Sequence, residues 1–124
     1  MSNEITVTTR VKLDNGALDY DFNPGAIRID QATNIMFARV VSIATTETTV
    51  ALTGITTPGV CILFNQDGTN YCEAGTTTAD YPFKLKPSGA GGIPNVFSLN
   101  AGKTTLYLKA NTAATKVLIV VLEA

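Results

Sequence analysis

The sequence has 124 residues, of which 45% are hydrophobic and 15% are charged, and its net charge is −1. Length and hydrophobic content predict a single folded domain, residues 1–124. The nine basic residues are scattered along the chain, which argues against nucleic-acid binding. The absence of histidine excludes catalysis by a Ser-His-Asp or Cys-His arrangement.

No apolar run reaches the roughly 18 residues of a membrane-spanning helix. The longest is the run 117–122, Val-Leu-Ile-Val-Val-Leu, near the C-terminus. The first residues lack the basic start and apolar stretch of a secretion signal. We therefore expect no membrane association and a chain that folds in the cytoplasm in which it is made.

The N-terminal third predicts strands joined by tight turns. Apolar and polar residues alternate along 5–13, which indicates a strand with one buried face. Asn15-Gly16 then favours a hairpin turn before a second alternating strand, 17–22. Asn23-Pro24-Gly25 is a turn, and 26–30 is a short strand.

The remaining chain continues in the same way. The apolar run 35–44 predicts a central strand partly buried on both sides. Strands 60–64 and 71–74 are predicted to pair as a hairpin across the loop 65–70. Further strands are expected at 48–52, 81–86, 93–99, 104–109 and 116–122.

Nine or ten short strands with frequent turns, and no helical spacer between them, predict an all-β protein. Helical spacers are what parallel βαβ units require, so the strands should be antiparallel. We expect a two-sheet antiparallel β-sandwich of jelly-roll type.

Few residues offer catalytic or metal-binding chemistry, so we expect no enzyme, no cofactor and no metal site. Asp19 and Asp21 share one strand face, which would permit a carboxylate pair, but two solvated outer-face carboxylates explain them equally well. A zinc site needs four soft ligands, and the chain has only two cysteines. Hydrolysis by the aspartate pair is the least favoured hypothesis.

Cys61 and Cys72 are equidistant from the midpoint of the predicted hairpin and would face one another across it. That separation is slightly wide for a disulfide, and a cytoplasm is reducing. Two buried thiols acting as small hydrophobic side chains are therefore preferred over a disulfide.

Two loops and four tyrosines are weaker candidates for ligand binding. The loop 67–70 (Asp-Gly-Thr-Asn) offers oxygen ligands but lacks the distal glutamate of a calcium loop, so a plain turn is preferred. The loop 87–92 has three glycines but no phosphate-binding ending, which favours a mobile surface loop. Exposed aromatics could stack on sugars, although each is better explained at the rim of the core. The tyrosines are Tyr20, Tyr71, Tyr81 and Tyr107.

Three segments, 1–5, 57–75 and 106–112, resemble small virion proteins of tailed bacteriophages. In those proteins an apolar strand ends in Asn, a short polar loop leads to Thr-Asn-Tyr, and a Gly closes the next strand. The matching positions here are Asn65, Thr69, Asn70, Tyr71 and Gly75. The two cysteines of the central segment depart from the apolar residues expected there, and residues 14–49 carry none of the resemblance.

The resemblance implies a virion structural protein, most closely a capsid decoration (cement) protein. Such a protein would be a homotrimer that binds the major capsid protein on the outside of the head and stabilises the shell. The alternative is a tail, baseplate or fibre module that binds host-surface glycan through its tyrosines and the 87–92 loop. Neither alternative supplies catalytic residues. A threonine-rich surface of low charge suits either role, because contact surfaces are depleted in Lys, Glu and Asp.

Overall fold

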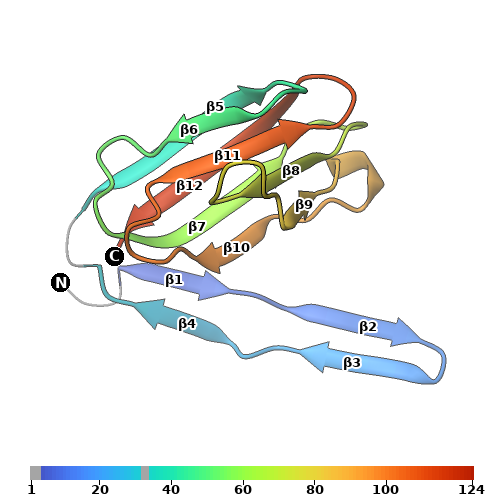
Figure 1. Cartoon of the computed structure of the whole chain (residues 1–124). Helices are drawn as coiled ribbons and strands as arrows, with labels where there is room; N and C mark the ends of the chain where they lie inside the picture. Colours follow the sequence, from blue (N-terminus) through green and yellow to red (C-terminus); the bar gives the residue numbers. More distant parts are fainter. Residues whose placement is uncertain (1–3, 32–33) are drawn as a thin grey trace. The chain divides into compact units, whose positions relative to one another are not determined.

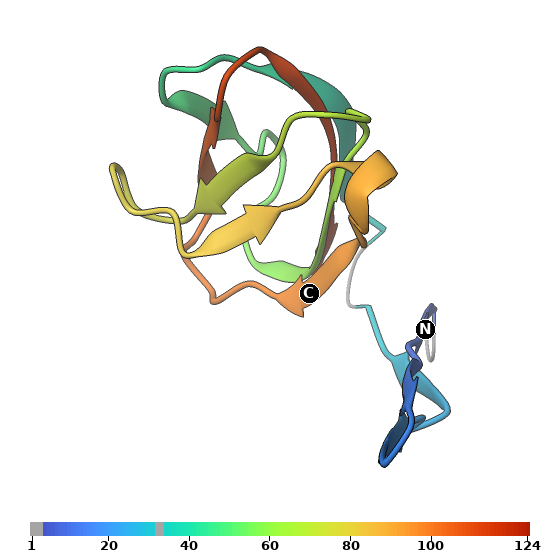
Figure 2. The ribbon, with the colours of Figure 1, turned by 90° about the vertical axis from the view of Figure 1, so that its right-hand side faces the viewer.

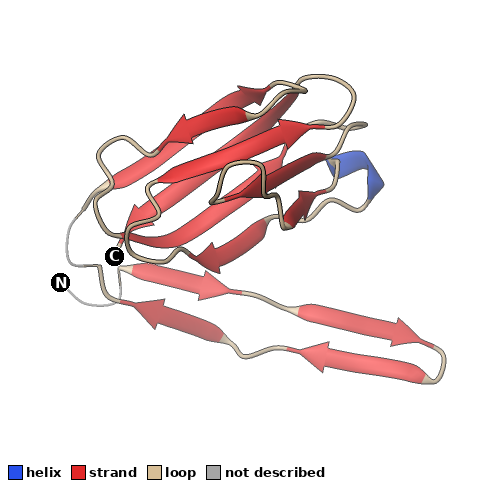
Figure 3. Cartoon of the chain, viewed as in Figure 1, coloured by secondary structure: helices blue, strands red, loops and turns tan. Residues whose placement is uncertain are grey.

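A computed structural model describes residues 4–31 and 34–124. All the regular elements are β-strands except for one 3-10 turn, Ser88–Ala90, so the all-β prediction is confirmed for the described residues (Figure 3). The strands form two compact units, one within residues 1–33 and one within residues 34–124. Each unit is described below by itself.

The first unit is a two-stranded antiparallel ribbon, here called the arm. In its proximal part, β1 (Ile5–Thr8) pairs with β4 (Ala26–Ile29). In its distal part, called the distal hairpin, β2 (Val11–Asn15) pairs with β3 (Leu18–Phe22). Gly16 takes a positive φ of 58° in the predicted Asn-Gly turn, a conformation that glycine adopts without steric cost.

The second unit is a sandwich of two antiparallel four-stranded sheets (Figure 1). The first sheet has the order β10-β7-β12-β5 and the second sheet β6-β11-β8-β9. The strands are β5 (Met36–Ile43), β6 (Thr48–Ala51), β7 (Pro58–Asn65), β8 (Cys72–Gly75), β9 (Phe83–Leu85), β10 (Asn95–Ser98), β11 (Thr105–Ala110) and β12 (Thr115–Glu123). In Figure 2 the strands of this unit curve around a common interior. The predicted two-sheet antiparallel sandwich is thus confirmed.

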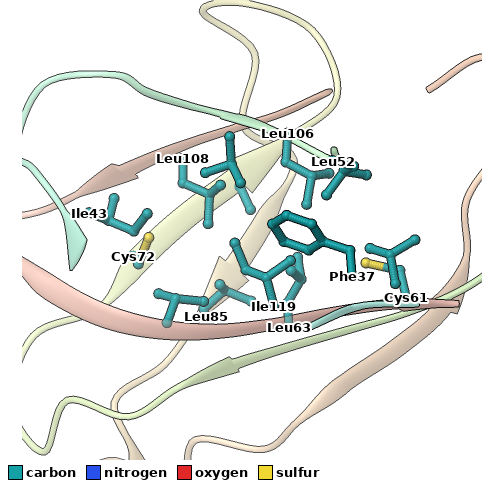
Figure 4. Close-up of a cluster of buried hydrophobic side chains, with 14 of the residues drawn as sticks. Phe37, Ile43, Leu52, Cys61, Leu63, Cys72, Leu85, Leu106, Leu108 and Ile119 are labelled. Atoms are coloured by element: carbon teal, nitrogen blue, oxygen red, sulfur yellow. The ribbon is translucent and has the colours of Figure 1, made fainter. Parts of the chain in front are cut away.

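Inward-facing side chains of both sheets form one hydrophobic core (Figure 4). Along β12, Val117, Ile119 and Val121 point inward and are fully buried, while the residues between them are not. Full burial of one such aliphatic side chain contributes about 1.5–3 kcal/mol relative to exposure. The core therefore rests on the period-two alternation of the sequence.

Two predictions about pairing are wrong. Strands 60–64 and 71–74 do not form a hairpin, because β7 pairs with β10 and β12 whereas β8 pairs with β9 and β11. The loop between them crosses from one sheet to the other. The run 35–44 is not a central strand either, since β5 lies at the edge of the first sheet and pairs only with β12 within the described residues.

Candidate interaction surface

The aspartates considered for catalysis are exposed on the charged face of the arm. Asp19 and Asp21 are both exposed on β3. The Asp21 carboxylate accepts hydrogen bonds from the Arg10 guanidinium at 2.9 and 3.1 Å, forming a surface ion pair. Such an exposed pair contributes little to stability and leaves no carboxylate in a water-excluded site. The geometry is that of a solvated face.

The two cysteines are free, fully buried thiols in different sheets. Cys61 is paired with Phe97 and Val121 in the first sheet, whereas Cys72 is paired with Ala110 and Leu85 in the second. Figure 4 draws them at opposite ends of the core cluster. Burial raises the pKa of Cys61 to about 12 and that of Cys72 to about 11, so neither is an activated nucleophile.

The loop 67–70 is a turn capped by its own aspartate. The Asp67 carboxylate accepts hydrogen bonds from the backbone N–H groups of Asn70 and Thr69 at 2.8 and 2.7 Å, which lower its pKa. Its Oδ1 thus caps the loop itself. Across the described residues, no three His, Cys, Asp or Glu side chains gather as metal ligands.

The glycines of the loop 87–92 serve close backbone packing. Ser88 N–H donates to the Asp67 carbonyl at 2.9 Å, and a Cβ on Gly89 would lie 2.5 Å from the carbonyl oxygen of Gly68. A Cβ on Gly92 would lie 2.3 Å from the Lys86 carbonyl. The sequence therefore needs glycine here for loop-against-loop contact, which is a sufficient structural reason for the motif.

The tyrosines do not gather into an aromatic platform. Tyr20 belongs to the arm, and Tyr107 points outward from β11. Tyr81 donates its hydroxyl to the Glu47 carboxylate at 2.7 Å, which raises the pKa of Tyr81 to about 12. The Tyr71 ring is covered by the Lys84 ammonium, 4.2 Å from the ring centroid. A hollow of about 190 Å³ beside the 87–92 loop is lined by Lys84, Lys86, Gly91, Ile93 and Asn95, without an aromatic side chain.

The outer face of the first sheet is the most unusual surface of the sandwich, because it is apolar. Its side chains alternate with core residues along each strand and belong to no core cluster. The register aligns them in rows, with Val40, Leu118 and Phe64 in one and Ala38, Val120 and Ile62 in the next. This apolar outer face comprises Met36, Ala38, Val40, Ile62, Phe64, Val96, Leu118, Val120 and Leu122.

Several of these side chains are widely open to solvent. Met36 is 59% exposed, Val40 51% and Val96 45%. Polar outward residues lie toward the two ends of the face, where Lys116 is paired with Ser42 and Ser98 with Val60. Antiparallel sheets that face water on one side normally alternate apolar-in and polar-out. A sheet that is apolar on both sides is instead typical of one that is covered on both sides.

The second sheet provides an internal comparison. Its outward positions carry Thr49, Thr105 and Tyr107, and a cross-strand row of charges runs through Lys109, Glu73 and Lys84. Opposite charges directly across strands stabilise a solvated sheet surface. One outer face of the sandwich is therefore polar and the other apolar, and a large exposed apolar surface is typical of an interaction site.

Sequence reasoning missed this surface, although a signal was present. The run 117–122 has apolar residues at consecutive positions, where a strand with one wet face would alternate. Its odd-numbered residues fill the core and its even-numbered residues form the apolar outer face. The run therefore indicates a strand that is apolar on both faces.

No protein-family model, curated protein or solved structure matches the chain. Among the described residues, no helix is long and apolar enough to cross a membrane.

Proposed function

We propose that the protein is a bacteriophage virion structural protein, a capsid decoration protein that binds the major capsid protein on the outside of the head as a homotrimer and stabilises the shell. The observation that carries the proposal is the apolar outer face of the first sheet, opposed to a polar second sheet. Exposure of such a surface to water is unfavourable, and covering it stabilises the complex by about 25 cal/mol for each Å² of apolar surface buried. It suits a chain whose work is to bind other protein surfaces.

The strand order supports the same role. Successive strands from β5 to β12 alternate between the two sheets, except at β8 and β9, which are neighbours in the second sheet. We interpret this order of eight strands as that of a jelly roll, an architecture found in viral capsid and lectin domains. Because one fold hosts many functions, this likeness supports the proposal only together with the apolar face.

A decoration protein also benefits from repetition. On a shell with many identical sites, an oligomer binds through several weak contacts at once, and the linked contacts multiply its effective affinity. The low charge of the sequence suits such contacts, because fewer hydrated Lys and Glu side chains have to be ordered on binding.

The test uses shells assembled from the major capsid protein of the same particle and lacking the decoration protein. Added protein should bind saturably and raise the temperature at which the shells break open. A Val40→Asp variant should bind less, because it introduces a charge into the apolar outer face, whereas Thr49→Asp on the second sheet serves as the matched control. Absence of saturable binding by the unaltered protein would overturn the proposal.

A further inference from the structure

The arm is amphipathic along its whole length. In the proximal part Ile5 is paired with Ile29 and Val7 with Ile27. In the distal hairpin Val11 is paired with Phe22 and Leu13 with Tyr20. Directly paired residues point to the same side of a ribbon, so each part has one apolar face. The five apolar side chains of the distal hairpin are 44–62% exposed: Val11, Leu13, Leu18, Tyr20 and Phe22.

The irregular centre of the arm preserves this amphipathic pattern. Two residues, Thr9 and Arg10, connect β1 to β2, while three residues, Asn23 to Gly25, connect β3 to β4. One strand thus carries an extra residue, as in a β-bulge, and Gly25 takes a positive φ of 80° there. The extra residue offsets the change from even-numbered apolar positions in β3 to odd-numbered ones in β4.

An isolated two-stranded ribbon is at best marginally stable in water, and it needs a further layer against its apolar face. The opposite face of the distal hairpin is suited to water, because Lys12 is paired with Asp21, and Asp14 with Asp19. The missing layer therefore belongs on one defined side, that of Tyr20 and Phe22.

The arm is too long for its own sandwich to supply that layer in full. From Ile29 to the start of the distal hairpin at Phe22 the ribbon measures about 24 Å, and β5, with eight residues, is also about 24 Å long. The connection is short, since Gln31 N–H donates to the Glu4 carboxylate and the Ile35 carbonyl accepts from Glu123 N–H. The four residue steps from Gln31 to Ile35 reach at most about 14 Å. A ribbon folded back along β5 would leave the hairpin tip at or beyond the end of the sheet.

We propose that the distal hairpin docks its apolar face on the apolar outer face of the first sheet of a second copy of this chain. The two surfaces match in chemistry, and a hairpin of five residue pairs is shorter than the eight-residue β5. The charged side of the hairpin, with Lys12 and Asp19, remains in water. Each copy gives one hairpin and receives one, so the contacts can close into a ring.

The docked hairpin would cover mostly apolar area. Tyr20 is 62% and Phe22 45% exposed, so docking removes about half of the roughly 150–250 Å² that full burial of each ring takes from water. Every copy both gives and receives a hairpin, so two such contacts hold each copy and act together.

The first experiment measures the mass of the full-length protein by sedimentation over a range of concentrations. We expect a multiple of 13.1 kDa for the unaltered chain. Tyr20→Asp in the hairpin and Val40→Asp on the sheet should each weaken assembly at least about tenfold, because either buries a charge in the contact. Asp19→Asn, on the charged side of the hairpin, and Thr49→Asp, on the second sheet, are the matched controls. A single-chain mass for the unaltered protein at every concentration, or assembly unaffected by Tyr20→Asp, would overturn the proposal.

The second experiment identifies the occupant directly. A Leu18→Cys chain and a Val120→Cys chain are refolded together and treated with a short bis-maleimide, for which the buried Cys61 and Cys72 give little background. We expect mixed dimers joined between positions 18 and 120. If a doubly substituted chain forms this link only within itself, the arm covers its own sheet and the proposal is wrong.

Neither experiment uses capsids, so the two proposals fail separately when shell binding is measured with the unaltered protein. Val40 lies in the proposed contact between copies, so Val40→Asp would lower shell binding through loss of assembly. An assembly linked through the hairpin that does not bind shells would leave the inference intact and remove the decoration function. Shell binding by a single-chain species would support binding to the head and overturn the docking of the hairpin on a second copy.

Discussion

At the scale of single residues, Glu123 shows how a charged group stabilises the end of a strand. Only 4% of the residue is exposed. Its carboxylate accepts from the Thr56 hydroxyl at 2.6 Å, from Thr57 N–H at 2.9 Å and from Thr56 N–H at 3.0 Å. These bonds favour the ionised form and hold the pKa of Glu123 below its usual range. The carboxylate thereby ties the C-terminal end of β12 to the loop before β7.

Replacing this group with Glu123→Gln should lower the melting temperature at pH 7, because the amide cannot accept all three bonds and brings an N–H toward donors. A lowered pKa means that the stabilisation is present above the ordinary glutamate pKa and disappears as pH falls through the folded-state value. Thermal melts at pH 7 and near pH 3 should therefore show a large difference from the parent that shrinks in acid. Asp14→Asn, in the exposed arm, is the control, and an equal loss at both pH values would contradict the assignment.

The buried thiols make a second prediction at this scale. Because burial raises the pKa of Cys61 and Cys72 to about 12 and about 11, both should resist a thiol-exchange reagent at pH 8 while the chain is folded. Addition of denaturant should expose two reactive thiols per chain. Rapid reaction of either thiol in the native protein would show that the core opens locally or is packed differently.

Gly75 is required by close packing at the end of β8. A Cβ at this position would lie 1.9 Å from the carbonyl oxygen of Asp80. We expect Gly75→Ala to lower the free energy of unfolding by about 1–3 kcal/mol, as overpacking commonly does. Gly68→Ala is the matched control, since a Cβ there meets nothing within 4 Å. Chemical denaturation of both variants provides the measurement, and similar values for the two would refute this explanation.

At the scale of elements, neighbouring residues of β12 should respond differently to substitution. Ile119 is fully buried in the core, so Ile119→Ala should lower the free energy of unfolding by about 2–5 kcal/mol. Leu118 faces the apolar outer face, so Leu118→Thr should change the unfolding of the single chain little and weaken its assembly. Denaturation and sedimentation of both variants separate the two effects. A large loss of single-chain stability in Leu118→Thr would mean that the outer face is already covered within one chain.

Strand positions could be predicted from the sequence, while strand partners could not. The alternation of apolar residues located nearly every strand to within two residues, including β11 and β12. Strand pairing depends on whether a loop returns the chain to the same sheet or crosses to the other one. The loop 65–70 resembles a hairpin loop in sequence. In the structure the buried Asn65 side chain donates to the carbonyls of Asn70 and Leu85 and accepts from Asp67 N–H, which directs the chain into the other sheet. The hydrogen bonds of this buried amide are therefore compatible with a crossing between sheets and not with the predicted hairpin of 60–64 and 71–74.

The candidate surface was hidden for a related reason. Whether Leu118 or Ile119 faces the core is decided by register with β5 and β7, and both are equally apolar in the sequence. The exclusion of histidine catalysis, in contrast, follows from composition alone. A reaction that requires a particular residue type can be excluded from the sequence alone. A surface formed by four strands can be predicted only when the order of those strands in the sheet is known.

At the scale of the whole molecule, the core and the arm should be separable. Every residue of the core cluster lies between Phe37 and Val121. A chain lacking residues 1–33 should therefore unfold cooperatively, with a melting temperature within a few degrees of the full-length single chain, and should sediment at single-chain mass. Calorimetry and sedimentation test the two parts of this prediction. Loss of the cooperative transition would show that the sandwich depends on the arm.

If the distal hairpin docks on a second copy, assembly depends on the concentration of the chain. A segment that gains its second layer from another molecule is stabilised by mass action, so its folded fraction rises with the concentration of the chain. Early in synthesis, when copies are scarce, residues 11–22 would remain uncovered. As copies accumulate, the same residues would become ordered as the rings form. The onset of assembly would then be timed by the abundance of the protein, without a separate regulator.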